Sequence, residues 1–262
     1  MEITSRDVAF PSEPVTLSVS SSEIETDDAV DWSGGGAPTS GTGRRFVTSF
    51  AAGGEYTVVA RRRGVETRAT ITVCPIDEWL MRARAFYGPS LDLSDVRVTT
   101  SWAVRGGAGT AWTCNTVIRF KRPKHPEDLP PEPTLIHELG HVWEHQNGQA
   151  QLLSGFVEQL GRLFGRDPYD YGGPEGVRRA PTLAGFSKES QAQIVTERWK
   201  ALHSYRADRM GIELSTAGYA EDLERLVVGA GIGVSPSSRR TVAGLIDAAV
   251  ATLVNLVLGR PR

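Results

Sequence analysis

The period of the hydrophobic pattern changes once along this chain, near residue 74, and the change limits the folds that the chain can adopt. Residues 15–19 alternate apolar and polar side chains, and a period of two is typical of half-buried β-strands. Residues 76–87 place apolar side chains three and four apart, which is typical of an amphipathic helix. We therefore expect an all-β domain at residues 1–74, followed by a mainly helical domain at residues 75–262.

Further alternating runs fill the first domain, and glycines separate them. Three more runs are expected to be strands: Phe46–Phe50, Tyr56–Ala60 and Ala69–Val73. The glycines at 34–36, 53–54 and 64 stand where hairpin turns would fall. Short strands at this spacing predict a small β-sandwich.

The first domain resembles the bacterial immunoglobulin-like and PKD-like modules. The resemblance rests on Trp32-Ser33-Gly34 and on Gly54-Glu55-Tyr56-Thr57-Val58, because these modules carry a strand tryptophan followed by a G-x-Y-x-V strand. It implies a sandwich over about 70 residues but no particular chemistry, since such modules act as spacers or as binding units.

The second domain combines a small sheet with helices. The strand candidates are Val96–Val104 and Ala111–Phe120. Residues 121–133 hold five prolines, so an extended loop precedes the next helix. From residue 134 onward the pattern is helical, except for a polar, glycine-rich loop at about 165–186. The expected fold class is α+β multidomain, an N-terminal all-β sandwich followed by a mainly helical domain with a small β-sheet.

The end of the chain is expected to be helical. The C-terminal helices, residues 219–258, follow a domain core at 76–205. Thr241–Leu258 is strongly apolar, but Asp247 and Asn255 interrupt it, and its 18 residues barely reach a membrane-spanning length. We expect a packing helix there and no membrane span.

Charge and cysteine content exclude several classes of protein. The chain has 29 basic and 31 acidic residues and no basic block beyond Arg61–Arg63, so we expect no nucleic-acid partner. Cys74 and Cys114 cannot form a disulfide framework or a cysteine-rich zinc site, and we expect two separate thiols. Met1–Arg6 lacks the apolar core of a signal peptide. We expect synthesis in the cytoplasm without a signal peptide, and a non-classical injection or secretion route for any export.

One short segment has the residue types and spacing of a metal-binding motif, His137-Glu138-Leu139-Gly140-His141. On a helix, residues four apart share a face, so both imidazoles can point at one metal ion. Glu138 is rotated by about 100° from His137, which suits a base that reaches a metal-bound water without being a ligand. Zinc with an open position lowers the pKa of that water to about 7. Every other residue from Thr134 to Trp143 is uncharged, as expected for a helix buried in a cleft.

This extended pattern resembles that of the zincin metallopeptidases, which need a third protein ligand. The metzincin subclass is excluded, because Glu144 and Asn147 stand where its glycine and histidine would be. His145 follows His141 by one turn, but three histidines in a row along one helix cannot converge on one tetrahedral ion. We expect His145 to face solvent or to support a ligand.

The gluzincin arrangement places a glutamate on a later helix, and Glu189 is the preferred candidate. Ser187 can cap the start of that helix, and Ala192 leaves room for a close approach to the motif helix. Its buried face is expected to hold four apolar residues, Ile194, Val195, Trp199 and Leu202. An acidic first-turn residue favoured by the helix dipole is the other interpretation of Glu189. Three further carboxylates stay open as alternatives: Glu197, Glu158 and Asp208.

A longer match strengthens this choice. The segments 112–120, 135–146 and 189–195 are similar to a bacterial family of metallopeptidase domains with an HEL-x-HVWQ helix and a later E-x-Q-A-x-I-V helix. Family members occur beside contractile injection and type VI secretion genes. The resemblance covers about residues 76–205 and implies zinc (Zn2+) at His137, His141 and Glu189, with Glu138 catalytic. The chain departs from it at Glu144 and Cys114, and neither position is a proposed ligand.

Four further residues are candidates for contacts with a substrate. His203 and Tyr205 lie beyond Glu189 and are candidate donors to the transition state, although ordinary helix positions explain them as well. Trp112 and Asn115 lie on the Ala111–Phe120 strand, which could pair with an extended peptide at the edge of a cleft.

The function expected from these residues is zinc-dependent peptide-bond hydrolysis by metal-activated water, with Glu138 as general base. The expected partners are a protein or peptide substrate and components of a contractile injection or secretion apparatus, of which the protein would be an effector or accessory. The alternative is a non-enzymatic, metal-stabilised structural or adaptor protein of such a system. Glu138 argues against the alternative, because metal retention alone does not require it.

Overall fold

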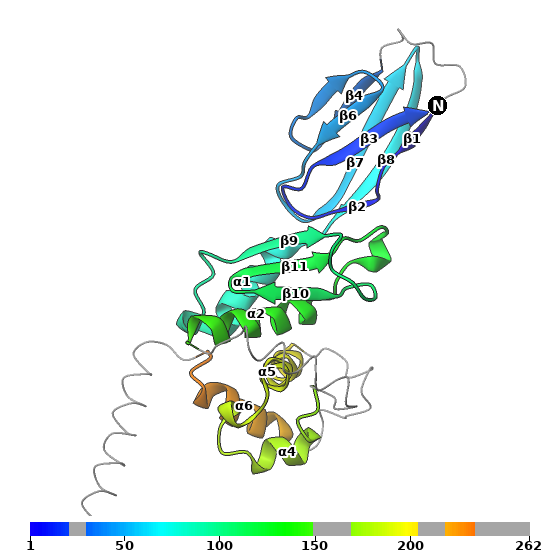
Figure 1. Ribbon diagram of the computed structural model, residues 1–262. Coiled ribbons are helices and arrows are strands. Elements are labelled where there is room, and N and C mark those ends of the chain that lie inside the picture. The colour runs from blue at the N-terminus through cyan, green and yellow to red at the C-terminus, as the bar shows by residue number, and fades with distance from the viewer. Residues whose placement is uncertain (21–29, 149–168, 204–217, 234–262) are drawn as a thin grey trace, which may run out of the picture. The chain divides into compact units, whose positions relative to one another are not determined.

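The structure is a computed structural model, and it describes residues 1–20, 30–148, 169–203 and 218–233 (Figure 1). It contains both helices and β-sheets, so the predicted α+β class is confirmed. Packing divides the chain into two compact units. The first unit is Met1–Arg82 with Asp95–Val142, and the second is Ala83–Ser94 with Trp143–Arg262. The predicted domain boundary between residues 74 and 75 stays a prediction.

The first 74 residues form two sheets. The three-stranded sheet has the order β1-β3-β6, with β1 at Glu2–Thr4, β3 at Val15–Ser20 and β6 at Arg45–Thr48. The five-stranded sheet has the order β2-β8-β7-β4-β5, with β2 at Val8–Ala9, β4 at Asp31–Gly34, β5 at Ser40–Thr42, β7 at Gly54–Arg62 and β8 at Val65–Val73. Neighbouring strands are antiparallel, except for the parallel pair β2–β8.

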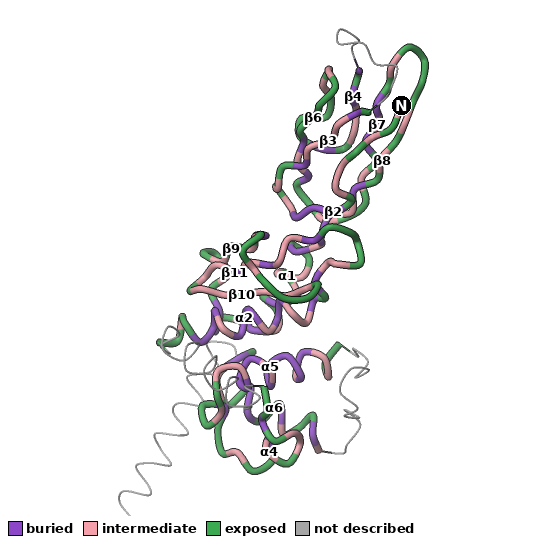
Figure 2. Tube along the Cα trace, turned by 45° about the vertical axis from the view of Figure 1, so that its right-hand side comes forward, coloured by how far each residue is buried: buried purple, intermediate pink, exposed green. Residues whose placement is uncertain are grey.

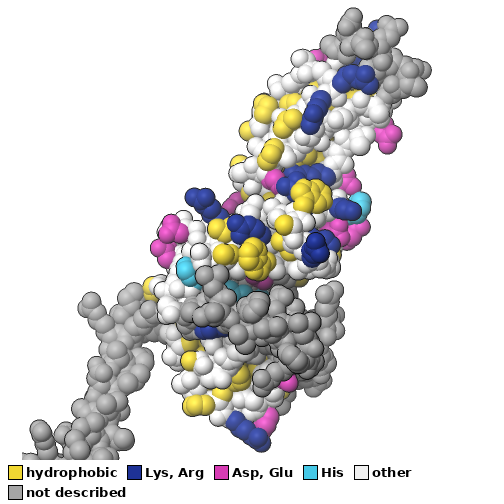
Figure 3. Space-filling model, viewed as in Figure 1, with side chains coloured by type: hydrophobic (Ala, Val, Ile, Leu, Met, Phe, Trp, Pro, Cys, Tyr) yellow, Lys and Arg dark blue, Asp and Glu magenta, His cyan; other side chains and the backbone are white. Residues whose placement is uncertain are grey.

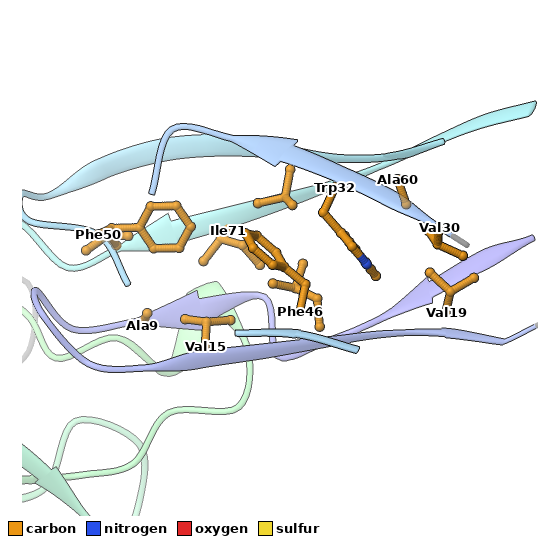
Figure 4. Packing of buried hydrophobic residues seen from close by; sticks show 12 residues of the cluster. Ala9, Val15, Val19, Val30, Trp32, Phe46, Phe50, Ala60 and Ile71 are labelled. Carbon is orange, nitrogen blue, oxygen red and sulfur yellow. The ribbon is translucent and has the colours of Figure 1, made fainter. Parts of the chain in front are cut away.

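The predicted alternation in these strands places one side of each in a common hydrophobic core. Val15, Leu17 and Val19 of β3 are buried, and residues from both sheets join the same cluster (Figure 4). Trp32 is 2% exposed, stacks on Phe46 with ring centroids 5.6 Å apart, and its indole N–H donates to a backbone carbonyl. Both sheets keep open edges among the described residues, so the immunoglobulin-like or PKD-like sandwich remains a prediction.

A helix and a second small sheet follow. The helix α1 spans Ile76–Tyr87, as predicted. The sheet has the order β10-β11-β9, with β9 at Arg97–Ser101, β10 at Ala111–Cys114 and β11 at Val117–Lys121. β11 is antiparallel to β10 and parallel to β9.

The prediction of one strand over Ala111–Phe120 is wrong, because the chain reverses within it. Cys114 pairs with Val117 across a two-residue turn, and Asn115 at the start of that turn has φ 55°. Asparagine tolerates this left-handed backbone better than most residues, because its short polar side chain can bond locally. The segment is therefore a hairpin.

The remaining elements are helical. α2 spans Glu132–Gln146, α4 spans Gly173–Arg179, α5 spans Lys188–Leu202 and α6 spans Tyr219–Gly229, with 3-10 turns η1 at Gly88–Ser90, η2 at Pro126–Asp128 and η3 at Leu183–Gly185. The predicted loop at 165–186 is wrong where α4 forms, because Pro174 fits the first turn of a helix and Gly172 supplies the left-handed residue before it. The predicted helix Thr241–Leu258 lies outside the described residues. No helix in the described ranges has the length and apolar character needed to cross a bilayer.

Candidate metal centre

The helix that carries the histidine motif begins at an ion pair. Glu132, in the first turn of α2, is 4% exposed and accepts two hydrogen bonds from Arg82 of α1, from Nε at 2.8 Å and from Nη2 at 2.9 Å. These bonds, with a further one to Glu78, raise the pKa of Arg82 above its usual value. Because the pair is bidentate, it fixes the start of α2 in direction as well as in place.

α2 is buried along almost its whole length (Figure 2). Its two motif histidines are four residues apart and so lie on one face. The rings of His137 and His141 have centroids 5.0 Å apart and are nearly perpendicular, at 84°. Both side chains are half-buried, whereas His145 is exposed, as expected. The four-residue spacing therefore turns two imidazoles toward the same region, as the motif predicts.

The third predicted ligand lies near the start of α5. Ser187 caps this helix by accepting a hydrogen bond from the backbone N–H of Ser190 at 3.2 Å, as predicted, and Glu189 lies in the first turn. Ala192, Ile194, Val195 and Trp199 are buried. The prediction that Leu202 is buried is wrong, because it is the last residue of α5 and is 50% exposed.

His137, His141 and Glu189 come together as a group that could hold a metal ion. Their candidate ligand atoms, one from each residue, all lie within 4.8 Å of one another. Ligands of one tetrahedral zinc ion are about 3.4 Å apart, because each lies about 2.1 Å from the metal. Two imidazole nitrogens and one carboxylate oxygen suit Zn2+ and other divalent transition metals.

Of the alternative carboxylates, Glu197 lies in the described residues and is not part of this group. Glu197 is 8% exposed and accepts hydrogen bonds from Gln193 at 2.7 Å and from Lys200 at 3.0 Å, so its charge is compensated within α5. Glu158 and Asp208 lie outside the described residues. Among the described residues, Glu189 is thus the carboxylate that accompanies the two histidines.

Glu138, the predicted general base, is 7% exposed and is held by a residue that is not among the predicted site residues. The hydroxyl of Thr113, on β10, donates to Oε2 of Glu138 at 2.6 Å. Because side chains alternate along a strand, Thr113 faces α2 while its neighbour Trp112 faces the other way. That alternation was the signal that could have placed Thr113 beside Glu138.

The other predicted substrate contacts have separate positions. Trp112 is 58% exposed, and the guanidinium carbon of Arg119 lies 5.7 Å from its ring centroid. Asn115 is in the exposed hairpin turn. His203 is the C-cap residue that follows α5. Its ring stacks on Trp199 with centroids 3.7 Å apart, and its Nδ1 lies 2.9 Å from the Trp199 carbonyl oxygen. Tyr205 lies outside the described residues. The proposed substrate contacts of Trp112, Asn115, His203 and Tyr205 stay predictions.

The two cysteines are separate free thiols, as expected. Cys74 is buried, and burial raises its pKa to about 12. Cys114 is half-buried at the end of β10.

No protein-family model matches the chain. Over 122 residues, 44% of its length, the chain is 29% identical to the type VI secretion system spike protein VgrG2b of Pseudomonas aeruginosa. The match covers 12% of that spike protein. The chain is therefore similar to a small part of a much longer secretion-system protein.

Proposed function

We propose that this protein is a zinc-dependent metallopeptidase with a zincin-like, gluzincin-type site. The observation that carries the proposal is the grouping of His137, His141 and Glu189, with their candidate ligand atoms within 4.8 Å of one another. Glu138 lies next in sequence to the first of them, with its carboxylate held by Thr113. These are the ligands and the base that water-mediated peptide hydrolysis needs.

Each part of the site has a separate task in this reaction. When bound, the zinc ion would act as a Lewis acid that polarises the scissile carbonyl and makes water more acidic. Glu138 accepts the proton of the attacking water on one carboxylate oxygen and returns it to the nitrogen of the leaving amine. The Thr113 hydroxyl occupies Oε2 of that carboxylate, which leaves Oε1 for the proton.

We further propose that the protein works with a bacterial injection or secretion system, as an effector or accessory. The similarity to a type VI secretion spike protein supports this association. The chain matches only 12% of that protein, so this proposal does not extend to the activity of the whole spike. The N-terminal sheets would then be an immunoglobulin-like or PKD-like module that carries or presents the metallopeptidase domain.

The competing function is a metal-stabilised structural or adaptor protein of the same system. A purely structural metal site needs His137, His141 and Glu189 but makes no use of Glu138. A buried carboxylate beside a metal site is costly unless it is hydrogen-bonded. Among the described residues, Thr113 supplies a hydrogen bond to one of the two carboxylate oxygens, Oε2. This arrangement favours catalysis over an adaptor role.

A search for new protein termini tests the proposal. Bacterial periplasmic and cytoplasmic extracts are incubated with the zinc-loaded chain or with Glu138→Gln, and new N-termini are identified by mass spectrometry. We expect cleavage products with the unsubstituted chain that are absent with Glu138→Gln, while both proteins bind the same amount of zinc.

Glu144→Gln is the matched control, because it removes a carboxylate from the same helix outside the proposed site. It should leave the cleavage products unchanged. Identical termini with the unsubstituted chain and with Glu138→Gln, each fully loaded with zinc, would favour the adaptor function.

A further inference from the structure

The sheet β10-β11-β9 has one buried face and one exposed face. Ile118 and Phe120 of β11 are fully buried, and Thr113 of β10 contacts Glu138 of α2. Side chains alternate along a strand, so the neighbours of these residues face the opposite side. Among them are Trp112 and Arg119, which are directly paired across β10 and β11.

We call this opposite side the basic-aromatic face. It is defined by four residues: Trp112, Arg97, Arg119 and Lys121. Trp112 is 58% exposed, which is unusual for the largest apolar side chain. Trp102 and Arg122 directly follow β9 and β11, and the alternation does not assign them to this side. Figure 3 shows hydrophobic and basic side chains gathered together over β9 to β11.

The charge of the basic-aromatic face has a single sign. Every charged side chain that the three strands direct to this side is basic, although the whole chain has a net charge of −2. Arg122 is paired with Glu13 at 2.9 Å, whereas no ion pair involves Arg97 or Arg119 within the described residues. A face of this kind attracts an anionic partner.

Trp112 restricts the chemistry of that partner. The guanidinium carbon of Arg119 lies over the ring of Trp112, 5.7 Å from its centroid. A guanidinium that covers an indole ring blocks the stacking of a nucleobase or a sugar on that side. The N–H edge of Arg119 has no ion-pair partner among the described residues, and it matches a carboxylate in bidentate geometry.

The position of the face relative to Glu138 indicates a polypeptide as the partner. Trp112 and Thr113 are consecutive residues of β10, with Trp112 on the basic-aromatic face and Thr113 bonded to Glu138. β10 is an edge strand of its sheet among the described residues. A bound polypeptide on this face thus needs to pass over only one strand, β10, to reach Glu138.

We propose that the basic-aromatic face binds an acidic segment of a polypeptide and so recruits acidic protein substrates to the site. The assignment of the bound segment as a substrate rests on the proposed peptidase function, whereas binding itself does not. Glutamate and aspartate side chains would pair with Arg97 and Arg119, and apolar neighbours would pack on Trp112.

A binding measurement on the inactive full chain tests this. A fluorescently labelled poly-L-glutamate peptide is titrated with Glu138→Gln at low salt, and its anisotropy is followed. We expect saturable binding that the additional Arg97→Ala and Arg119→Ala substitutions weaken at least tenfold. Trp112→Ala should weaken it severalfold, and raised salt should weaken it further, because exposed charges are screened.

Matched controls distinguish binding by the basic-aromatic face from a general effect of the charge of the chain. Arg44→Ala with Arg45→Ala removes two exposed arginines at the start of β6, in the sheet β1-β3-β6, and should leave the affinity within twofold. Met81→Ala removes an exposed apolar side chain (66% exposed) away from the face and should do the same. Poly-L-lysine should not bind. Urea unfolding of each variant checks that it is folded.

Two results would overturn the proposal. The first is that the glutamate peptide does not bind, or that it binds the Arg97→Ala, Arg119→Ala variant as tightly as the parent chain. The second is that the chain binds vesicles of phosphatidylglycerol and phosphatidylcholine but not the peptide, which would assign the face to a membrane. Because Glu138→Gln is used throughout, a failure of binding is distinct from a failure of hydrolysis, which the search for new termini measures.

Discussion

Thr113 of β10 and Glu138 of α2 are joined by a hydrogen bond of 2.6 Å, from the threonine hydroxyl to Oε2 of the carboxylate. The bond links the edge strand of a sheet to the helix that carries both motif histidines. A hydroxyl bonded to a carboxylate at this distance is a strong, charge-assisted contact. We infer that Thr113 is a positioning residue, which holds one oxygen of Glu138 and orients the other.

Removal of the Thr113 hydroxyl should slow catalysis without loss of metal. In Thr113→Val, which keeps the shape of the side chain, we expect kcat to fall about 10- to 100-fold, a typical cost for the loss of a residue that orients a catalytic group. Thr113→Ser keeps the hydroxyl and should recover most of the rate. Kinetics on a substrate found by the terminus search, with the zinc content measured alongside, check this. Equal kcat in the valine and serine variants would remove the positioning role.

Loss of the ion pair between Arg82 and Glu132 should lower the free energy of unfolding more than loss of an exposed ion pair. Glu132→Gln leaves the Arg82 guanidinium beside a neutral group. We expect the free energy of unfolding to fall by about 1–2 kcal/mol, because Glu132 is buried while Arg82 is 36% exposed and partly screened by solvent. Urea unfolding followed by circular dichroism measures it.

Glu175→Gln is the control for this substitution. It breaks the exposed pairs with Arg178 at 3.1 Å and Arg179 at 2.7 Å, and pairs of that kind are worth at most about 1 kcal/mol. A loss in Glu132→Gln no larger than in Glu175→Gln would contradict the anchoring of α2 by Arg82.

The two thiols should differ in reactivity. Burial raises the pKa of Cys74 to about 12, so at pH 8 it is protonated and hidden, whereas Cys114 is half-buried. Thiolate is the reactive form, so iodoacetamide should label Cys114 first and Cys74 only on unfolding. Mass spectrometry of the native chain at pH 8 checks the order; early labelling of Cys74 would contradict its burial.

The same burial gives stability a pH dependence with a definite sign. Above a pH of about 9, the unfolded chain loses the Cys74 proton that the folded chain keeps until a pH of about 12. Stability should therefore fall as the pH rises through that window. Cys74→Ala should reduce this slope, as measured by urea unfolding at several pH values; an unchanged slope would contradict the raised pKa.

Local patterns predicted much of the fold and most of the candidate site. The spacing of Ile76 to Tyr87 predicted α1, and the four-residue spacing of His137 and His141 placed both rings on one face. Ser187 predicted the start of α5, and with it the turn that holds Glu189. In these cases, the information lies within one helix and its cap.

The features that the sequence did not predict depend on contacts between distant residues or on backbone conformation. Thr113 and Glu138 are 25 residues apart, and Arg82 and Glu132 are 50 apart, so no local period relates them. The β10–β11 hairpin depends on the left-handed Asn115, which a period-two pattern does not reveal. Leu202 fits the apolar period of α5 but lies where the helix ends.

Metal analysis of the purified protein tests whether His137, His141 and Glu189 bind one zinc ion together. We expect about one zinc per chain, no zinc after His137→Ala with His141→Ala, and a zinc affinity at least tenfold weaker in Glu189→Ala. Glu197→Ala, which removes a carboxylate of the same helix that is outside the group, should keep full zinc content. A Glu189→Ala variant with undiminished zinc affinity, or an unsubstituted chain that binds no zinc, would show that these three residues do not form a zinc site.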